Sequence, residues 1–261
     1  MDIFKIEKRL AGALSLVPRV VFYKTTDSTN LRAREYAREN PKGRTPTVFI
    51  ADGQTAGRGR RGRSFESPAG SGLYLSFLLY PKSKGADATA ITAYSAVKLA
   101  EALEECAPLS AGIKWVNDII VGGRKIAGIL AEAEMSSEGE IGCIVVGMGI
   151  NVYKNALSDE LSSIATSVEE ETGERISREE LAAELIIRFL SRCYDFTVED
   201  ILPEYRRRST LIGEEITVHA TSGEEYPARA VGIDSDLSLR VQTHGGEEKS
   251  LISATVSVRK K

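Results

Sequence analysis

Residues 47–79 read TVFIADGQTAGRGRRGRSFESPAGSGLYLSFLL, and they predict two buried strands joined by a long polar loop. The apolar runs 47–52 and 73–79 are typical of strands, and the glycines and the proline between them are typical of a loop. Within the loop, residues 57–63 hold four arginines, three glycines and no acid. Glycine lets the backbone approach a ligand, and arginine forms charge-assisted hydrogen bonds to phosphate or carboxylate. The loop therefore indicates a site for a phosphate-bearing ligand.

The same heptapeptide is also typical of nucleic-acid-binding tails, so binding of RNA or DNA through residues 58–63 is an alternative. The heptapeptide lies between two strands rather than at a terminus, and Asp52 and Glu66 flank it. A nucleic-acid-binding surface usually spreads along one face. The formal net charge of −3, from 34 basic and 37 acidic residues, argues against a general polyanion binder. These observations favour the phosphate-ligand interpretation.

Hydrophobic spacing outside the loop predicts an α+β domain followed by a small β domain. The helices are expected at residues 1–16, 29–40, 89–106, 177–193 and 198–207. The further strands are expected at residues 20–23, 112–116, 119–121, 124–134 and 141–146, with polar breaks at 117–118 and 147–151. From Leu211 onward, five short alternating strands predict a small antiparallel barrel. We place the boundary there, which gives domains 1–210 and 211–261.

The remaining composition excludes several classes of protein. Cys106, Cys143 and Cys193 lie far apart and form no C-x-x-C pair, which argues against a disulfide framework or a zinc site and fits a reducing cytosol. His219 and His244 are the two histidines and have no metal-ligand spacing, so we expect no His-based metal centre. Residues 1–19 lack the apolar run of a signal peptide, and no apolar stretch has the length of a membrane span. We expect a cytoplasmic protein without a membrane partner.

Four further motifs each have an ordinary structural explanation. Residues 114–118 (Lys-Trp-Val-Asn-Asp) are typical of a hairpin turn, and Gly147–Asn151 of a β-bulge. Thr25–Asn30 is typical of a capped helix start. Lys125 at the start of an apolar strand is typical of a solvated strand end, although it could also be a point charge held beside reacting groups.

In this order and spacing, the motifs resemble the successive blocks of biotin–protein ligases over residues 23–153. The blocks are TTDSTN (25–30), QTAGRGRRGR (54–63), LYLSF (73–77), KWVND (114–118), GRKIAGILAE (123–132) and GMGINV (147–152). The arginine–glycine block and the RKIAGIL run, occurring together, are highly specific. The resemblance implies a catalytic domain like that of class II aminoacyl-tRNA synthetases, a mixed sheet with helices mostly on one face. It also implies a second domain like a Src-homology-3 barrel.

The resemblance assigns roles by position. The residues that would bind biotin are Ser28, Thr29, Asn30, Gln54, Gly57, Arg58, Gly59, Arg60 and Lys125. The residues that would bind ATP are Arg58, Arg60, Arg61, Arg63, Asn117 and Asn151. Three of these would act in catalysis, namely Arg58, Arg60 and Lys125. No protein residue is assigned as a metal ligand.

The implied reaction has two steps. Biotin and ATP would form biotinyl-5′-AMP and pyrophosphate, with Mg²⁺ as the cofactor of ATP, and the biotin would then pass to a lysine of a biotin carboxyl carrier domain. The first step joins two anions, and the cationic side chains would screen their repulsion. A lipoate or octanoate ligase on the related fold is the nearest alternative enzyme, and the arginine–glycine block favours biotin.

Two residues depart from the common pattern, and the N-terminal length adds an expectation. Val116 replaces a frequent proline, which could loosen the turn at Asn117, and Phe65 replaces a tryptophan as an apolar wall. Some members carry an N-terminal helix-turn-helix domain that represses transcription, but only 27 residues precede Ser28. We therefore expect the short monofunctional form, without operator DNA as a partner. The resemblance also implies a homodimer.

Overall fold

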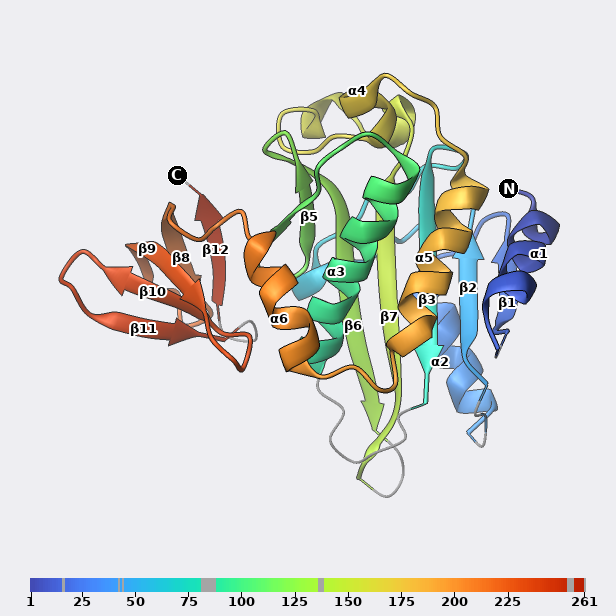
Figure 1. Cartoon of the computed structure of the whole chain (residues 1–261), viewed down its shortest axis with the longest axis horizontal. Coiled ribbons are helices and arrows are strands. Elements are labelled where there is room, and N and C mark those ends of the chain that lie inside the picture. The colour runs from blue at the N-terminus through green and yellow to red at the C-terminus, as the bar shows by residue number, and fades with distance from the viewer. Residues whose placement is uncertain are drawn as a thin grey trace.

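A mixed seven-stranded sheet forms the centre of the larger part of the protein (Figure 1). The structure is a computed structural model that describes residues 1–15, 17–41, 43, 45–80, 88–135, 139–252 and 256–260. The strand order is β1-β2-β3-β7-β6-β5-β4, with β1 and β2 parallel and the other neighbours antiparallel. The strands are β1 (Arg19–Tyr23), β2 (Thr47–Ala51), β3 (Gly72–Leu79), β4 (Gly112–Lys114), β5 (Asp118–Val121), β6 (Arg124–Met135) and β7 (Ile141–Asn151).

Helices cover the two faces of this sheet unequally, as the family resemblance implied (Figure 1). One face packs against α3 (Ala88–Cys106), α5 (Arg178–Arg192) and α6 (Val198–Arg207), and α1 (Ile3–Ala13) packs on α5. The other face carries α2 (Thr29–Glu39), which contacts β2, β3 and β7. The shorter helices are α4 (Val168–Thr172), η1 (Arg60–Gly62), η2 (Lys154–Ala156) and η3 (Asp159–Leu161).

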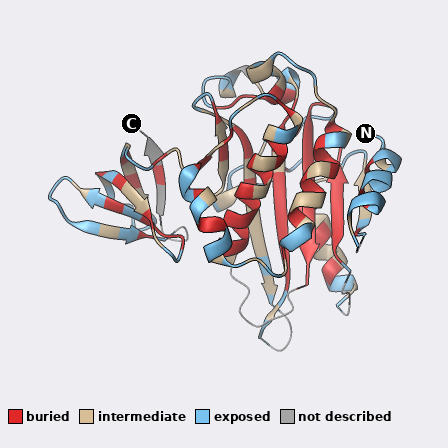
Figure 2. Cartoon of the chain, viewed as in Figure 1, coloured by how far each residue is buried: buried red, intermediate tan, exposed pale blue. Residues whose placement is uncertain are grey.

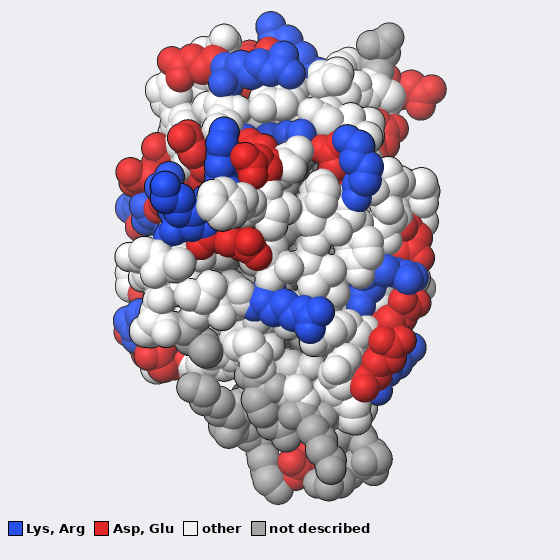
Figure 3. Space-filling view, turned by 90° about the vertical axis from the view of Figure 1, so that its right-hand side faces the viewer, with Lys and Arg blue, Asp and Glu red and all other residues white. Residues whose placement is uncertain are grey.

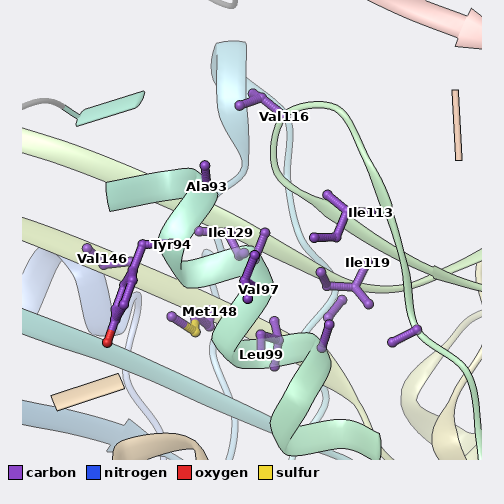
Figure 4. Packing of buried hydrophobic residues seen from close by; sticks show 14 of the residues in the cluster. Ala93, Tyr94, Val97, Leu99, Ile113, Val116, Ile119, Ile129, Val146 and Met148 are labelled. Carbon is purple, nitrogen blue, oxygen red and sulfur yellow. The ribbon is translucent and has the colours of Figure 1, made fainter. Parts of the chain in front are cut away.

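The alternation of side chains along β7 separates a core face from a polar face. Val146 and Met148 lie in the large apolar cluster with Tyr94 and Val97 of α3 (Figure 4). At Gly147, between them, a side chain would lie on the opposite face, against Asn30 of α2. The buried residues concentrate in the central strands and on the inner sides of α3 and α5 (Figure 2). The face with α2 is thus left less covered, and the site described below lies there.

A second, smaller sheet follows α6. It contains β8 (Glu215–Ala220), β9 (Glu225–Ile233), β10 (Leu239–Thr243), β11 (Glu248–Leu251) and β12 (Val256–Lys260), all in antiparallel pairs. The five short strands expected after Leu211 are therefore present. Two side chains of the larger part reach this sheet: the indole N–H of Trp115 donates to the backbone oxygen of Leu237 at 2.9 Å, and Arg206 Nε donates to that of Ile233 at 2.7 Å.

Some predicted boundaries were wrong. The break expected at Gly147–Asn151 is strand, because β3 and β7 pair without a register shift as far as Gly72 and Asn151. The strand expected at 112–116 ends at Lys114, since residues 115–117 form the turn into β5. The helix α4 and the two 3-10 turns before it were not predicted. Leu16, at the end of the first predicted helix, lies outside the described residues, as do residues 253–255 and 261 of the last domain.

No helix among the described residues is both long and apolar enough to cross a membrane.

Candidate active site

A cleft of about 1280 Å³ opens on the sheet face that carries α2. Strands β6 and β7 supply its floor, and the start of α2 and the loop after β2 form one wall. Residues of the 157–165 segment and of the 209–214 connection line the opposite side. A smaller pocket of about 420 Å³ lies away from this region, between Tyr36 and Tyr80. Because the cleft gathers the sequence motifs, we consider it the candidate site.

Three glycines make the floor of the cleft flat. A Cβ atom on Gly147 would lie 2.1 Å from Asn30 Oδ1, and one on Gly149 would lie 2.5 Å from the Phe65 ring. A Cβ on Gly128 would lie 2.9 Å from the Nζ of Lys125. Glycine at 147 and 149 therefore lets side chains from other elements lie directly on the sheet, whereas at Gly128 the flexible end of Lys125 could move aside. The GMGIN motif is such a floor, and its strand pairing continues without a bulge.

A polar network joins the start of α2 to the loop and the sheet. The backbone N–H of Thr29 donates to Gln54 Oε1 at 2.8 Å, and Gln54 Nε2 donates to Ser67 Oγ at 2.9 Å. The hydroxyl of Ser76, in the middle of β3, lies 2.6 Å from Asn30 Oδ1. These residues are mostly buried, and each hydrogen bond fixes the direction of a side-chain amide or hydroxyl.

Ser28 stands at the N-cap position of α2 and is buried. The capping explanation of the motif predicts that its hydroxyl accepts a hydrogen bond from the first turn. The structure shows no such side-chain bond. Ser28 lines the cleft instead of capping the helix with its side chain.

The arginine-rich loop folds back on itself over the cleft. The N–H of Phe65 donates to the backbone oxygen of Gly57 at 2.9 Å, and the N–H of Gly59 donates to that of Arg63 at 2.7 Å. At the tip, Arg61 and Gly62 have positive φ angles of 57° and 72°. The loop is therefore a short hairpin rather than an extended tail.

The four arginines of the loop, Arg58, Arg60, Arg61 and Arg63, all line the cleft. Gly57 is not among the residues that line it. A Cβ atom there would lie 2.3 Å from the backbone oxygen of Phe65, so Gly57 allows the hairpin to close. Gly57 thus lies at the base of the loop hairpin, where the two sides of the hairpin approach closely. Gly59, two residues further on, does line the cleft.

Arg60 is half-buried, whereas the other three loop arginines are exposed. Its Nη1 donates to Asn117 Oδ1 at 3.0 Å, and the Nδ2 of Asn117 donates to the backbone oxygen of Ile129 at 2.9 Å. Burial lowers the pKa of Arg60, and the neighbouring Arg61 lowers it further. Asn117 thus connects the tip of the loop to the floor of the cleft.

Lys125 faces the loop across the cleft. Its Nζ lies 2.7 Å from Asp118 Oδ1 and 5.9 Å from the centre of the Phe65 ring. Its backbone is held as well, because its N–H donates to Ile164 and its oxygen accepts from Thr166. A solvated strand end would not need these contacts. The structure therefore places Lys125 as a fixed cation beside the arginine loop.

Asn151 ends β7 at the far side of the glycine floor and is 2% exposed. Its Nδ2 donates to the backbone oxygen of Thr166 at 3.0 Å, which fixes the amide. Its Oδ1 is buried and has no hydrogen-bond partner among the described residues. Buried polar atoms are nearly always paired, so this oxygen is ready to accept from a ligand, from water or from a hydrated cation.

The structure brings together all of the sequence-derived site residues, with Gly57 just behind the cleft wall. Sequence reasoning assigned no role to Ser76, Asp118 and Glu132, which contact Asn30, Lys125 and Arg58 respectively. A serine within the apolar LYLSF strand was the available signal for Ser76. Within the described residues, no group of three His, Cys, Asp or Glu side chains could hold a metal ion.

Comparison with known proteins agrees with this site. Residues 22–151 match the sequence model of the biotin/lipoate A/B protein ligase family. The bifunctional ligase/repressor BirA of Bacillus subtilis is 33% identical over 236 residues, which are 88% of this chain and 71% of that protein. The biotin–(acetyl-CoA-carboxylase) ligase of Paracoccus denitrificans is 31% identical over 231 residues, 85% of this chain and 94% of that protein.

A solved structure supports the same conclusion. The biotin protein ligase from Aquifex aeolicus in complex with biotin and ATP superposes with a TM-score of 0.78 at 27% identity, over 93% of this chain and 99% of that one. The chain thus covers 71% and 94% of the two sequence relatives and has the fold of the Aquifex aeolicus ligase. The chain belongs to the biotin/lipoate A/B protein ligase family.

Proposed function

We propose that the protein is an ATP-dependent biotin–protein ligase. It activates biotin as biotinyl-5′-AMP, releases pyrophosphate and transfers biotin to a lysine of a biotin carboxyl carrier domain. The observation that carries the proposal is that Lys125 and the four loop arginines line the same cleft. The Nζ of Lys125 lies 5.9 Å from the ring of Phe65, which ends the loop hairpin. The relatives named as biotin ligases, and the related structure with biotin and ATP, support it.

The polar network around α2 suits the ureido ring of biotin. That ring presents one oxygen acceptor and two N–H donors, and it needs a small set of fixed polar partners in an otherwise apolar pocket. Ser28, Thr29, Asn30 and Gln54 supply such partners at one end of the cleft. Gly147 and Gly149 let Asn30 and the Phe65 ring lie close against the sheet, where Phe65 gives the proposed pocket an apolar wall.

The cationic end of the cleft suits the adenylation step. The biotin carboxylate attacks the α-phosphorus of ATP, a P–O bond forms, and the bond to the pyrophosphate leaving group breaks. Both reactants are anions, so Arg58, Arg60 and Lys125 offset their repulsion and stabilise the developing charge. Arg61, Arg63, Asn117 and Asn151 also line the cleft, and the proposal assigns them to the nucleotide. The step needs no protein nucleophile.

Mg²⁺ fits the donors of this cleft. The ion prefers oxygen ligands, keeps several waters and commonly takes one or two carboxylates together with substrate phosphates. Asp118 offers a carboxylate and Asn151 Oδ1 is a buried oxygen without a partner among the described residues. When bound, Mg²⁺ would reduce the negative charge of the ATP phosphates. These two residues would hold it.

In the transfer step, the neutral amine of the acceptor lysine attacks the carbonyl carbon of the mixed anhydride. An amide bond forms, the bond to phosphate breaks, AMP leaves, and the amine proton passes to water. The folded loop would limit the access of water to the adenylate before this step. The protein therefore has to hold the adenylate until the acceptor arrives.

Binding of nucleic acid through the arginine loop is less well supported. Arg58 pairs with Glu132 on the sheet, and Arg60 donates to Asn117 in the cleft. Figure 3 shows another side of the protein, the one with α1 and β1 at the right of Figure 1, and there too Lys and Arg side chains lie beside Asp and Glu rather than in a patch of one sign. A continuous basic surface is what a nucleic-acid footprint needs.

We also propose the division into domains 1–210 and 211–261. The support is that α6 ends at Arg207, that Thr210 still pairs with Ile113 of β4, and that β8 begins at Glu215 in a separate sheet. The homodimer and the absence of operator DNA as a partner stay predictions from the family resemblance.

One experiment tests the proposed function. The protein is incubated with ATP and Mg²⁺ together with either biotin or lipoate, and pyrophosphate and the acyl-adenylate are measured. We expect pyrophosphate and biotinyl-AMP with biotin and neither product above background with lipoate. Preferential adenylation of lipoate would assign the protein to the other branch of the family. Activity with neither acid would contradict the proposal.

A further inference from the structure

Glu132 is a partly buried carboxylate that contacts two elements of one cleft wall, the helix α2 and the arginine loop. It lies on β6, on the face that carries the site, and its side chain is 20% exposed. Its Oε2 accepts a hydrogen bond from Asn30 Nδ2 at 2.9 Å. Its Oε1 lies 3.3 Å from Arg34 Nη1 and 3.4 Å from Arg58 Nη1. One carboxylate therefore joins the sheet, α2 and the arginine loop.

The contact with Asn30 fixes the direction of that amide. Its Nδ2 donates to Glu132 and, at 3.3 Å, to the backbone oxygen of Leu130. Its Oδ1 lies 2.6 Å from the hydroxyl of Ser76. A flipped amide would place two donors at Ser76 and an oxygen against a carboxylate, which electrostatics disfavours. Glu132 thus decides which atoms Asn30 presents around the cleft.

The contact with Arg58 holds the loop to the sheet. It is made by one guanidinium nitrogen, and the Arg58 side chain remains 45% exposed. An ion pair of this kind is weak, so an anionic ligand can share or take over the guanidinium. If Arg58 leaves, Arg34 remains beside Glu132 and offsets its charge. The carboxylate can therefore release Arg58 without being left unpaired.

We propose that Glu132 is a positioning residue for the arginine loop. It orients Asn30 and tethers Arg58 at the cleft, so that the loop is already folded when the anionic intermediate forms. Because the loop is already ordered in the free protein, binding of the ligand loses less conformational entropy. This inference rests on the proposed function for its ligand, the acyl-adenylate, but its structural part concerns the free protein.

Glu134 provides a matched control on the same strand. It lies two residues further along, on the same face, and is 21% exposed. It pairs with Arg34 and Arg38 of α2, and no contact with Asn30 or Arg58 is recorded among the described residues. Glu132→Gln and Glu134→Gln therefore make the same change of charge in the same surroundings, while only the first touches the loop.

The first test measures hydrogen exchange in the ligand-free protein. The amides of Gly59 and Phe65 are hydrogen-bonded within the loop hairpin. We expect Glu132→Gln to speed their exchange by up to about fivefold, the factor that corresponds to a weak ion pair. Glu134→Gln should leave it unchanged. Equal exchange in the two variants would overturn the inference, whatever the activity of the protein.

The second test measures how fast preformed biotinyl-AMP leaves the protein. We expect faster release in Glu132→Gln, again by up to about fivefold, and no change in Glu134→Gln. In an Arg58→Ala background the effect of Glu132→Gln should shrink to the part that acts through Asn30, whereas an effect that acts through stability alone would persist at full size. Persistence at full size would therefore overturn the tether. If the unmodified protein forms no adenylate, the proposed function fails, and the exchange experiment still decides the role of Glu132.

Discussion

The guanidinium of Arg60 donates to the side-chain oxygen of Asn117 across 3.0 Å, and this bond joins the tip of the arginine loop to the far wall of the cleft. Asn117 is itself bonded to Ile129 on the floor. The loop tip thus has a defined position in the free protein. A bound adenylate would lie beneath it, with Arg60 between the ligand and bulk water.

We predict that Arg60→Gly weakens retention of the adenylate. The change removes a charge-assisted hydrogen-bond donor, which is worth about 1.5–3 kcal/mol, so release should be faster by roughly 10- to 150-fold. The measurement is the dissociation rate of preformed biotinyl-AMP, with thermal melting as the check that the fold is intact. An unchanged rate in a folded variant would remove Arg60 from the clamp.

We predict that Lys125→Ala severely slows adenylation. Loss of one fixed electrostatic donor commonly lowers a rate by about 10²- to 10³-fold, and Lys125 is held in place by Asp118 and by its backbone pairing. The measurement is pyrophosphate release in a single turnover. Lys125→Arg keeps the charge and should retain more activity than the alanine variant. A near-normal rate in Lys125→Ala would rule out its proposed role.

The sequence predicted those parts of the site whose residues lie close together in the chain and form recognisable motifs. The arginine–glycine loop could be found because four guanidinium groups and three glycines lie together between two apolar strands. Lys125 alone is typical of a solvated strand end, and its role came from the family resemblance. The spacing of apolar residues gave most of the helices and strands, whereas the resemblance implied how they are arranged. The start of α2 was also found, although Ser28 does not cap the helix with its side chain as the motif suggests.

The parts that were missed depend on pairing between distant segments. The role of Glu132 follows from the face of β6 on which it lies. That face could not be read from simple alternation, because β6 has a bulge opposite Ile119 and Ile120. As a result, the consecutive residues Ile126 and Ala127 both lie in the core. The strand character of 147–151 comes from pairing with β3. The helix α4 has five residues, too few to give a helical period.

We predict that Gly149→Ala disturbs both stability and the loop. A methyl group there would meet the Phe65 ring at 2.5 Å, and overpacking of this kind costs about 1–3 kcal/mol. Gly12 in α1 is the control, because no atom lies within 4 Å of a Cβ placed on it. Gly12→Ala should be neutral or slightly stabilising, since alanine favours a helix. Urea unfolding of the two variants checks this, and equal stabilities would contradict the tight floor.

We predict that Glu204 stabilises the fold in a pH-dependent way. Hydrogen bonds from Arg207, and then from Arg208, lower the pKa of Glu204 from 4.5 to about 2. A carboxyl group whose pKa is lower in the folded than in the unfolded protein stabilises the fold at pH values above its unfolded pKa. For Glu204 this stabilisation is lost as the pH falls from about 4.5 to about 2. Glu204→Gln should therefore lower the melting temperature at pH 7 and have a shrinking effect below pH 4.5. A difference between the two proteins that does not depend on pH would contradict this origin.

We predict that Trp115→Phe weakens the link between the two sheets and slows adenylation. The indole N–H donates to the buried carbonyl of Leu237, and leaving that carbonyl unpaired costs about 1–3 kcal/mol. The same turn carries Asn117, the partner of Arg60, so a looser turn loosens the loop tip. Tyr205→Phe removes a second bond to this turn, from the Tyr205 hydroxyl to the oxygen of Val116, without touching the smaller sheet. Slower adenylation in both variants would place the effect in the turn, whereas normal adenylation in a destabilised Trp115→Phe would show that the small sheet supports stability alone.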